Sequence, residues 1–94
     1  MSEERERLYS RLSAIPGLEP MPSIGDWVLV AVDDPQDLAR KINRRMAPGI
    51  VSVPRQVKSA VRFPVRTPRE NEQLYAVIRE VMDMRRPRIR RVVG

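Results

Sequence analysis

Three stretches of the chain repeat apolar residues at the spacing of an amphipathic helix. Apolar side chains three or four positions apart share one face of a helix, and that face packs on a core. We therefore expect helices at 2–14, at 35–46 and from 68 to a point before Pro87. The inward-facing residues of these helices are Leu8, Leu12 and Ile15, then Leu38, Ile42 and Met46, then Leu74, Val77, Ile78, Val81 and Met82.

The second and third helices also carry signals for their first turn. Asp34 suits an N-cap, and Pro35 suits the first helical position, where its missing N–H costs nothing. In the third helix, Thr67 precedes Pro68, and Glu70 follows three residues after Thr67. This pattern predicts a capping box, in which the two side chains each accept a hydrogen bond from the other's backbone N–H.

The segment 26–32, with the sequence DWVLVAV, is apolar at both odd and even positions. Because both faces of this strand are apolar, we expect it to be central in a sheet and covered on both sides. Partial cover would leave an apolar face available to a partner. Two further strands are expected at 50–53 and 60–65. Pro64 favours a sheet edge for the last of them, because proline cannot donate a ladder hydrogen bond.

These elements predict an α+β domain in the order α-β-α-β-β-α. Its three-stranded sheet is mainly antiparallel, and the helices pack on it. A chain of 94 residues has the length of one domain. We place that domain at 1–84 and treat 85–94 as a basic tail that is disordered.

Two residue types that carry much of enzyme chemistry are absent from the chain. It has no cysteine and no histidine, which excludes disulfides, thiol nucleophiles and the commonest general base. A Ser-His-Asp or Cys-His arrangement is therefore impossible. No apolar run is long enough to span a bilayer, and the first residues lack the apolar core of a signal peptide. We therefore expect a cytoplasmic protein with no membrane contact.

The formal charge of +6 is concentrated in the tail. Removing its five arginines from the 18 basic residues leaves 13, against 12 acidic residues. Two interpretations of the tail stay open, either a set of phosphate contacts or a solvated chain end. The arginines concerned are Arg85, Arg86, Arg88, Arg90 and Arg91.

Three aspartates lie close together at the start of the second predicted helix. Asp33, Asp34 and Asp37 have the carboxylates that a divalent metal prefers. Helix capping explains two of the three without a metal. We therefore expect a capping role and no metal site.

Four segments of the chain, taken in order, resemble the C-terminal small domain of class I/II PLP-dependent aminotransferases. The likeness is greatest to the histidinol-phosphate aminotransferase group and runs from about residue 3 to residue 82. The segments are RERLYSRLSAIPGLEPMPS, GDWVLVAV, DDPQDLARKINRRMAPGIVSV and VRFPVRTPRENEQLYAVIREVM. No single segment is specific, but their order and spacing together are.

The resemblance implies a role for Arg62. In that family the arginine of the last segment binds the α-carboxylate of the substrate, and Arg62 aligns with it. A planar guanidinium suits a carboxylate because it donates two parallel hydrogen bonds. The alternative is an edge-strand arginine that lies over apolar surface with its head in water. The chain departs from the family at Arg66, where the family has glycine, and at Asp26, where it has asparagine.

The family's catalysis also requires a lysine that forms a Schiff base with PLP, and this lysine belongs to a separate large domain. Lys41 and Lys58, the two lysines of the chain, do not match it. We therefore expect a non-catalytic, protein-binding relative of the small domain that holds no cofactor. Its partner would be a PLP-binding large domain, another protein or a second copy. Two alternatives stay open. In the first, the tail binds nucleic acid or another anion. In the second, the chain is one half of a split PLP-dependent aminotransferase.

Overall fold

The computed structural model describes residues 3–22 and 25–85 of the chain. Three helices and three strands alternate in the order α-β-β-α-β-α. The helices are α1 (Glu3–Ser13), α2 (Pro35–Arg45) and α3 (Pro68–Arg85), and the strands are β1 (Glu19–Met21), β2 (Trp27–Ala31) and β3 (Ala60–Pro64). None of the helices in the described ranges is both long and apolar enough to cross a membrane.

The α+β class and the antiparallel three-stranded sheet are confirmed. The strands lie in the order β1-β2-β3, so β2 is central and β3 is at an edge, as the sequence predicted. Both neighbours of β2 run antiparallel to it. The predicted order of elements was wrong, however, because the sheet contains 19–21 and not 50–53.

The segment 50–53 is withheld from the sheet by a side chain of α2. The Asn43 amide accepts from the Val51 backbone N–H at 2.8 Å and donates to the Val51 carbonyl at 2.9 Å. The backbone of Val51 is therefore bonded to a side chain and not to a strand. Only Ser52 reaches β3, as an isolated antiparallel bridge to Arg62.

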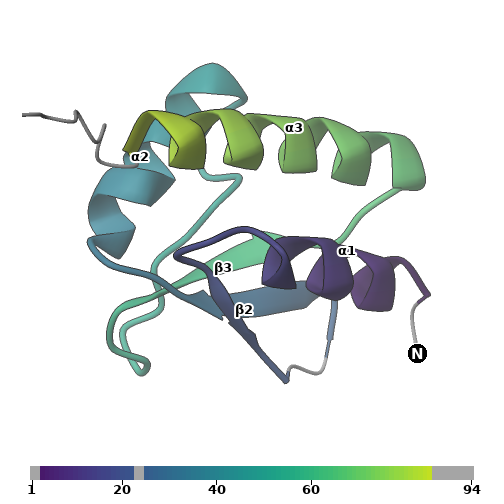
Figure 1. Cartoon of the computed structure of the whole chain (residues 1–94), viewed down its shortest axis with the longest axis horizontal. Coiled ribbons are helices and arrows are strands. Elements are labelled where there is room, and N and C mark those ends of the chain that lie inside the picture. The colour runs from purple at the N-terminus through teal and green to yellow at the C-terminus, as the bar shows by residue number, and fades with distance from the viewer. Residues whose placement is uncertain (1–2, 23–24, 86–94) are drawn as a thin grey trace, which may run out of the picture.

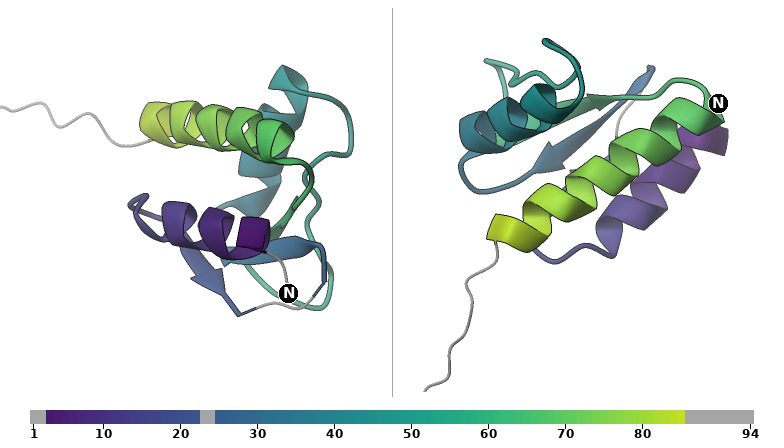
Figure 2. Two further views of the ribbon diagram at one scale, coloured as in Figure 1. Left: turned by 90° about the vertical axis from the view of Figure 1, so that its right-hand side faces the viewer. Right: turned by 90° about the horizontal axis from the view of Figure 1, so that it is seen from above.

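All three helices lie on the same side of the sheet (Figure 1). The helix α1 packs on β1 and β2, and α2 packs on β3. Seen from above, α3 lies between α1 and α2 and contacts both (Figure 2). The core lies between these helices and one face of the sheet. The largest fully buried side chains are Phe63, Leu12, Leu38, Ile42, Ile78, Val28, Val30, Val61 and Val81.

The predicted capping box at the start of α3 is confirmed. The Thr67 N–H donates to Glu70 Oε1 at 3.3 Å, and the Glu70 N–H donates to Thr67 Oγ1 at 3.2 Å. One turn further on, the buried Asn71 accepts from the Arg66 N–H at 2.8 Å and donates to Glu4 at 3.0 Å. These hydrogen bonds join the first turn of α3 to α1.

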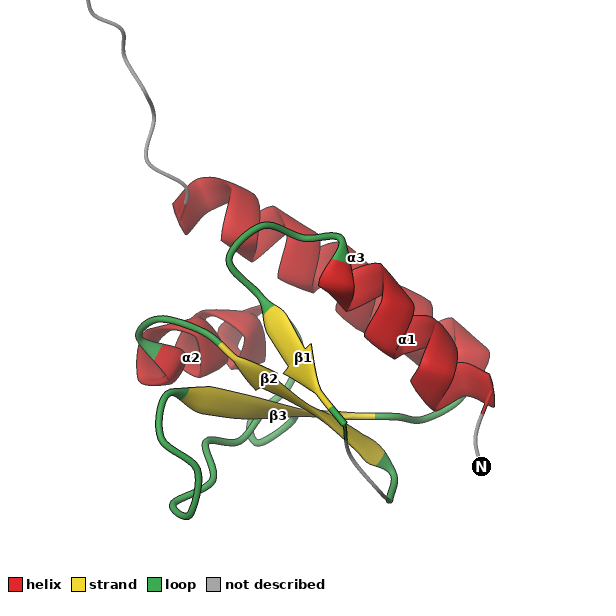
Figure 3. Cartoon of the chain, turned by 60° about the horizontal axis from the view of Figure 1, so that its bottom comes forward, coloured by secondary structure: helices red, strands yellow, loops and turns green. Residues whose placement is uncertain are grey.

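Among residues 3–22 and 25–85, no helix lies on the other face of the sheet (Figure 3). The prediction that β2 is covered on both sides was therefore wrong. Val28 and Val30 are fully buried, whereas Trp27 is 38% exposed and Leu29 and Ala31 are only partly buried. The three helices in the described part of the chain all lie on the opposite side of the sheet.

Candidate functional site

The uncovered face of the sheet is formed by side chains from all three strands. In an antiparallel pair, directly opposed residues point to the same face. Met21 opposes Leu29, Leu29 opposes Arg62, and Trp27 opposes Pro64. We call this surface the open face, and define it by Glu19, Met21, Trp27, Leu29, Ala31, Arg62 and Pro64. Ala60, opposite Ala31, is on the same side but is buried.

Arg62 lies at the middle of β3 and is held by two neighbours. Its Nε donates to Ser52 Oγ at 3.3 Å, and its guanidinium carbon is 5.1 Å from the centroid of the Trp27 ring. The backbones of Arg62 and Ser52 also exchange hydrogen bonds at 2.8 and 3.3 Å. Within residues 3–22 and 25–85, the two terminal nitrogens of Arg62 have no hydrogen bond or ion pair. The guanidinium is therefore held in place, and the N–H groups of its two terminal nitrogens are available to an acceptor.

Trp27, the first residue of β2, is the largest apolar side chain of the same surface and lies at one end of it. Gly25 has a φ of +100°, a conformation that residues with a Cβ rarely adopt. A Cβ at that position would lie 3.0 Å from the indole ring. The glycine therefore lets the indole lie close to its own loop while Arg62 lies near the ring. A guanidinium near an indole is also favoured electrostatically, by about 0.5–1 kcal/mol at exposed sites.

Further positive charge lies beside the open face. Arg55 and Lys58 are exposed in the connection between Ser52 and β3. This connection extends past the sheet on the side away from the helices (Figure 1). In the described part of the chain, no carboxylate lies within ion-pair distance of Arg55, Lys58 or Arg62. Glu19 is exposed at the β1 edge of the same face and forms no ion pair with these three cations among the described residues.

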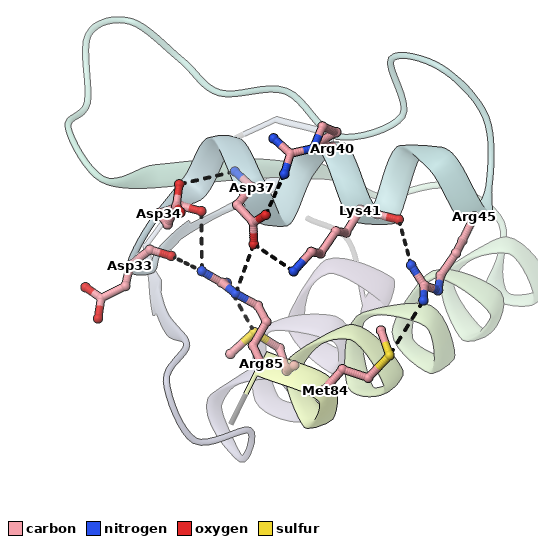
Figure 4. A network of polar contacts seen from close by, with 9 residues as sticks. Asp33, Asp34, Asp37, Arg40, Lys41, Arg45, Met84 and Arg85 are labelled. Atoms are coloured by element: carbon pink, nitrogen blue, oxygen red, sulfur yellow. Dashed lines mark hydrogen bonds and ion pairs between the residues drawn. The ribbon is translucent and has the colours of Figure 1, made fainter. Parts of the chain in front are cut away.

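A different arrangement surrounds Arg85, the first arginine of the predicted basic tail. Arg85 is the last residue of α3, and its side chain reaches the start of α2 (Figure 4). Its Nε lies 3.5 Å from Asp37 Oδ2, and its Nη2 donates to the carbonyls of Asp33 and Asp34. The Arg85 side chain is only 15% exposed. It therefore joins α3 to α2, while Arg86, Arg88, Arg90 and Arg91 lie outside the described residues.

Asp37 is the centre of this ion-pair cluster. It lies 2.7 Å from Arg40 and 3.2 Å from Lys41, in addition to its contact with Arg85. Desolvation alone would raise the pKa of Asp37. The hydrogen bond from Lys41 and the positive charges of Lys41, Arg40 and Arg85 oppose it, and together they lower the pKa below its ordinary value. Asp37 is therefore held in its ionised form by three cations.

Capping accounts for one of the three aspartates of this region. The carboxylate of Asp37 forms ion pairs, and Asp33 accepts from Arg85 through its backbone carbonyl. Asp34 is the N-cap of α2, as predicted, and accepts from the Asp37 N–H at 3.4 Å. In the parts of the chain that the structure describes, no group of three or more His, Cys, Asp or Glu side chains is placed to hold a metal ion.

The chain matches no protein-family model, and it matches none of the curated proteins.

The structure brings together residues that the sequence did not connect. Arg62 was singled out from the sequence, but Ser52 and Trp27 were not assigned to it. Trp27 and Phe63, on neighbouring strands, have different environments. Phe63 is fully buried, whereas Trp27 lies on the open face with Arg62. The sequence signal for an exposed apolar face was that 26–32 is apolar at both odd and even positions, because this gives the strand an apolar surface on each face of the sheet.

Proposed function

We propose that this chain is a non-catalytic protein-binding domain, and that its partner covers the open face of the sheet. The observation that carries the proposal is the combination of apolar side chains and an oriented, unneutralised arginine on one uncovered face. Exposed apolar patches of this kind mark interaction sites in many proteins. A Trp and an Arg together are also the residue types that dominate binding energy at protein interfaces.

Binding is favoured over catalysis by the chemistry available. The whole chain lacks histidine and cysteine, and the ionisable side chains of the open face are Arg62 on β3 and Glu19 on β1. The guanidinium of Arg62 is a hydrogen-bond donor with no acceptor atom. Arg62 can therefore hold an anionic group but is not suited to transfer a proton at neutral pH.

The resemblance to an aminotransferase small domain suggests which partner to test first. In that family the small domain packs on a large domain that carries PLP. A separate PLP-binding chain is accordingly the first candidate, and Arg62 would face it. If the assembled complex had aminotransferase activity, the chain would be one half of a split enzyme.

Photo-crosslinking from the open face tests the proposal. A photoreactive residue at position 31, on the open face, is compared with one at Ala76, which is exposed on α3. We expect position 31 to capture a defined protein, identified by mass spectrometry, that position 76 does not capture. Capture should be lost in Trp27→Glu. Equal capture from both positions, or none from position 31, would contradict the proposal.

The absorption spectrum of the captured complex separates the remaining possibilities. A band of bound PLP would identify the partner as a cofactor-carrying chain and make Arg62→Ala the next variant to assay with substrate. A complex without this band supports a purely structural interaction. Nucleic acid in place of protein, released only when residues 86–94 are deleted, would favour the basic tail as the binding element.

A further inference from the structure

We infer that the element of the partner that binds the open face is a single amphipathic helix carrying acidic side chains. This inference rests on the proposed function, because it specifies the partner of the same surface. It follows from the edges of the sheet, from the size of the open face and from the charges around it.

Addition of a strand is disfavoured at both edges of the sheet. The strand β1 has only three residues, and Pro20 in its middle has no N–H to donate. At the other edge, the backbone of Arg62 in the middle of β3 is already hydrogen-bonded to Ser52. An incoming strand would find few consecutive backbone N–H and C=O groups free to pair with it. A partner therefore has to bind the face and not an edge.

The open face is long and wide enough to hold a helix. The strands β2 and β3 have five residues each, which is a length of about 17 Å, and three strands span a width of about 10 Å. A helix with its side chains is about 10–12 Å wide, and 11 residues of it extend about 17 Å. On the opposite face two helices of this length contact the strands, α1 on β1 and β2 and α2 on β3, so a single bound helix would cover only part of the open face.

A second copy of the chain fits this surface less well. A second copy carries the same excess of positive charge on this side, from Arg55, Lys58 and Arg62 against Glu19. A helix of a different protein that carries acidic side chains has the complementary charge.

The charge around the face selects the polar residues of that helix. Arg62 on β3 and Arg55 and Lys58 in the preceding connection have no acidic partner among the described residues. Elsewhere the chain neutralises many of its cations internally, for example Arg11 with Glu72 and Lys41 with Asp37. A carboxylate of the bound helix would accept charge-assisted hydrogen bonds from the guanidinium of Arg62.

A single-stranded nucleic acid is the other polyanion that a basic surface attracts, but the described open face lacks a stacking platform. Successive bases stack on successive aromatic rings. Trp27 is the only aromatic residue of the open face, and Gly25 and Arg62 already lie close to its ring. Its other apolar members are Met21, Leu29, Ala31 and Pro64, which suit the aliphatic stripe of a helix.

The experiment uses Trp27 as its own reporter, because it is the only tryptophan in the chain. Three probes without tryptophan are titrated into the full chain. They are an 18-residue helical peptide with a leucine stripe flanked by glutamates, the same peptide with lysines in place of glutamates, and a 12-nucleotide oligouridine. We expect only the acidic peptide to shift the emission of Trp27 to shorter wavelength in a saturable way.

Two variants with the same change in charge test the role of the basic residues. Arg55→Gln/Arg62→Gln should weaken binding of the acidic peptide by about tenfold or more, since a hydrogen bond to a charged group contributes about 1.5–3 kcal/mol. Arg44→Gln/Arg69→Gln removes the same charge from exposed positions on α2 and α3 and should change binding less than threefold.

Equal binding of the lysine peptide, or a response to oligouridine alone, would overturn the inference. The photo-crosslinking experiment separates this outcome from failure of the proposed function. If position 31 still captures a protein that binds through a loop or a sheet, the proposed function stands and the acidic helix is wrong. If position 31 captures nothing, both fail.

Discussion

The two faces of β2 are almost equally apolar in sequence, yet they have different environments. Val28 and Val30 point to the helices and are fully buried. Trp27, Leu29 and Ala31 point the other way and keep part of their surface in water. Apolar residues on a strand therefore show that a face is suited to burial, but they do not show whether the same chain supplies the cover.

Polar groups differ between the two sides in the same way. On the helical side, Asn71 is joined to Arg66 and Glu4, and Arg85 is joined to Asp37. On the open face, Arg62 has one side-chain hydrogen bond, to Ser52, and its outer nitrogens point to no partner in the described chain. The polar groups of the helical side are paired within the fold, whereas the open side keeps partly exposed apolar side chains and an arginine that forms no ion pair with the described residues.

The largest expected effect comes from placing the same charge on each face of β2. Val30→Asp would bury a carboxylate without a partner, which costs several kcal/mol and should unfold a domain of ordinary stability. Leu29→Asp, one residue away, should lower the free energy of unfolding by only about 1 kcal/mol. Urea denaturation followed by circular dichroism measures both. Equal loss of stability would show that both faces are covered.

A smaller effect is expected from removing the buried amide that holds the helical side together. Asn71→Ala would leave the Arg66 N–H and Glu4 without their partner, at a cost of about 1–3 kcal/mol in the free energy of unfolding. Gln73→Ala changes an exposed residue of the same helix and should cost less than about 0.5 kcal/mol. The same urea titration applies. Similar losses in the free energy of unfolding for the two variants would show that the hydrogen bonds of Asn71 do not stabilise the helical side.

The smallest effect concerns the Asp37 cluster that joins α2 and α3. Because folding lowers the pKa of Asp37, its contribution to stability is present above its ordinary pKa of about 3.9 and is lost as the pH falls through the lowered value. Between pH 5 and pH 2, stability should therefore fall more steeply in the wild type than in Asp37→Asn. Asp26→Asn removes the same charge outside the cluster and should keep the wild-type slope. An unchanged slope in Asp37→Asn would contradict the interpretation.

Local signals predicted much of the fold. The capping box of α3 and the N-cap of α2 were identified because each involves residues three positions apart. The central place of β2 followed from its apolar composition. β1 was missed because it is short, contains Pro20 and depends on pairing with β2. The loss of a strand at 50–53 depends on Asn43, eight residues before Val51, and no local pattern indicates that contact.

The candidate site was predicted only in part, for the same reason. Arg62 was recognised from the motif that contains it, but Ser52 and Trp27 come to it from other segments through the pairing of the sheet. The open face itself depends on where α1, α2 and α3 pack. A periodic sequence pattern describes each element separately and cannot assign three helices to one side of a sheet.

Quenching of Trp27 fluorescence by acrylamide tests most directly whether a partner covers the open face. It is measured in the isolated chain and again in the complex recovered by crosslinking from position 31, with a partner that lacks tryptophan or has its tryptophans replaced. The account predicts strong quenching in the isolated chain, where Trp27 is 38% exposed, and protection in the complex. Protection already in the isolated chain, or equal quenching in both states, would contradict it.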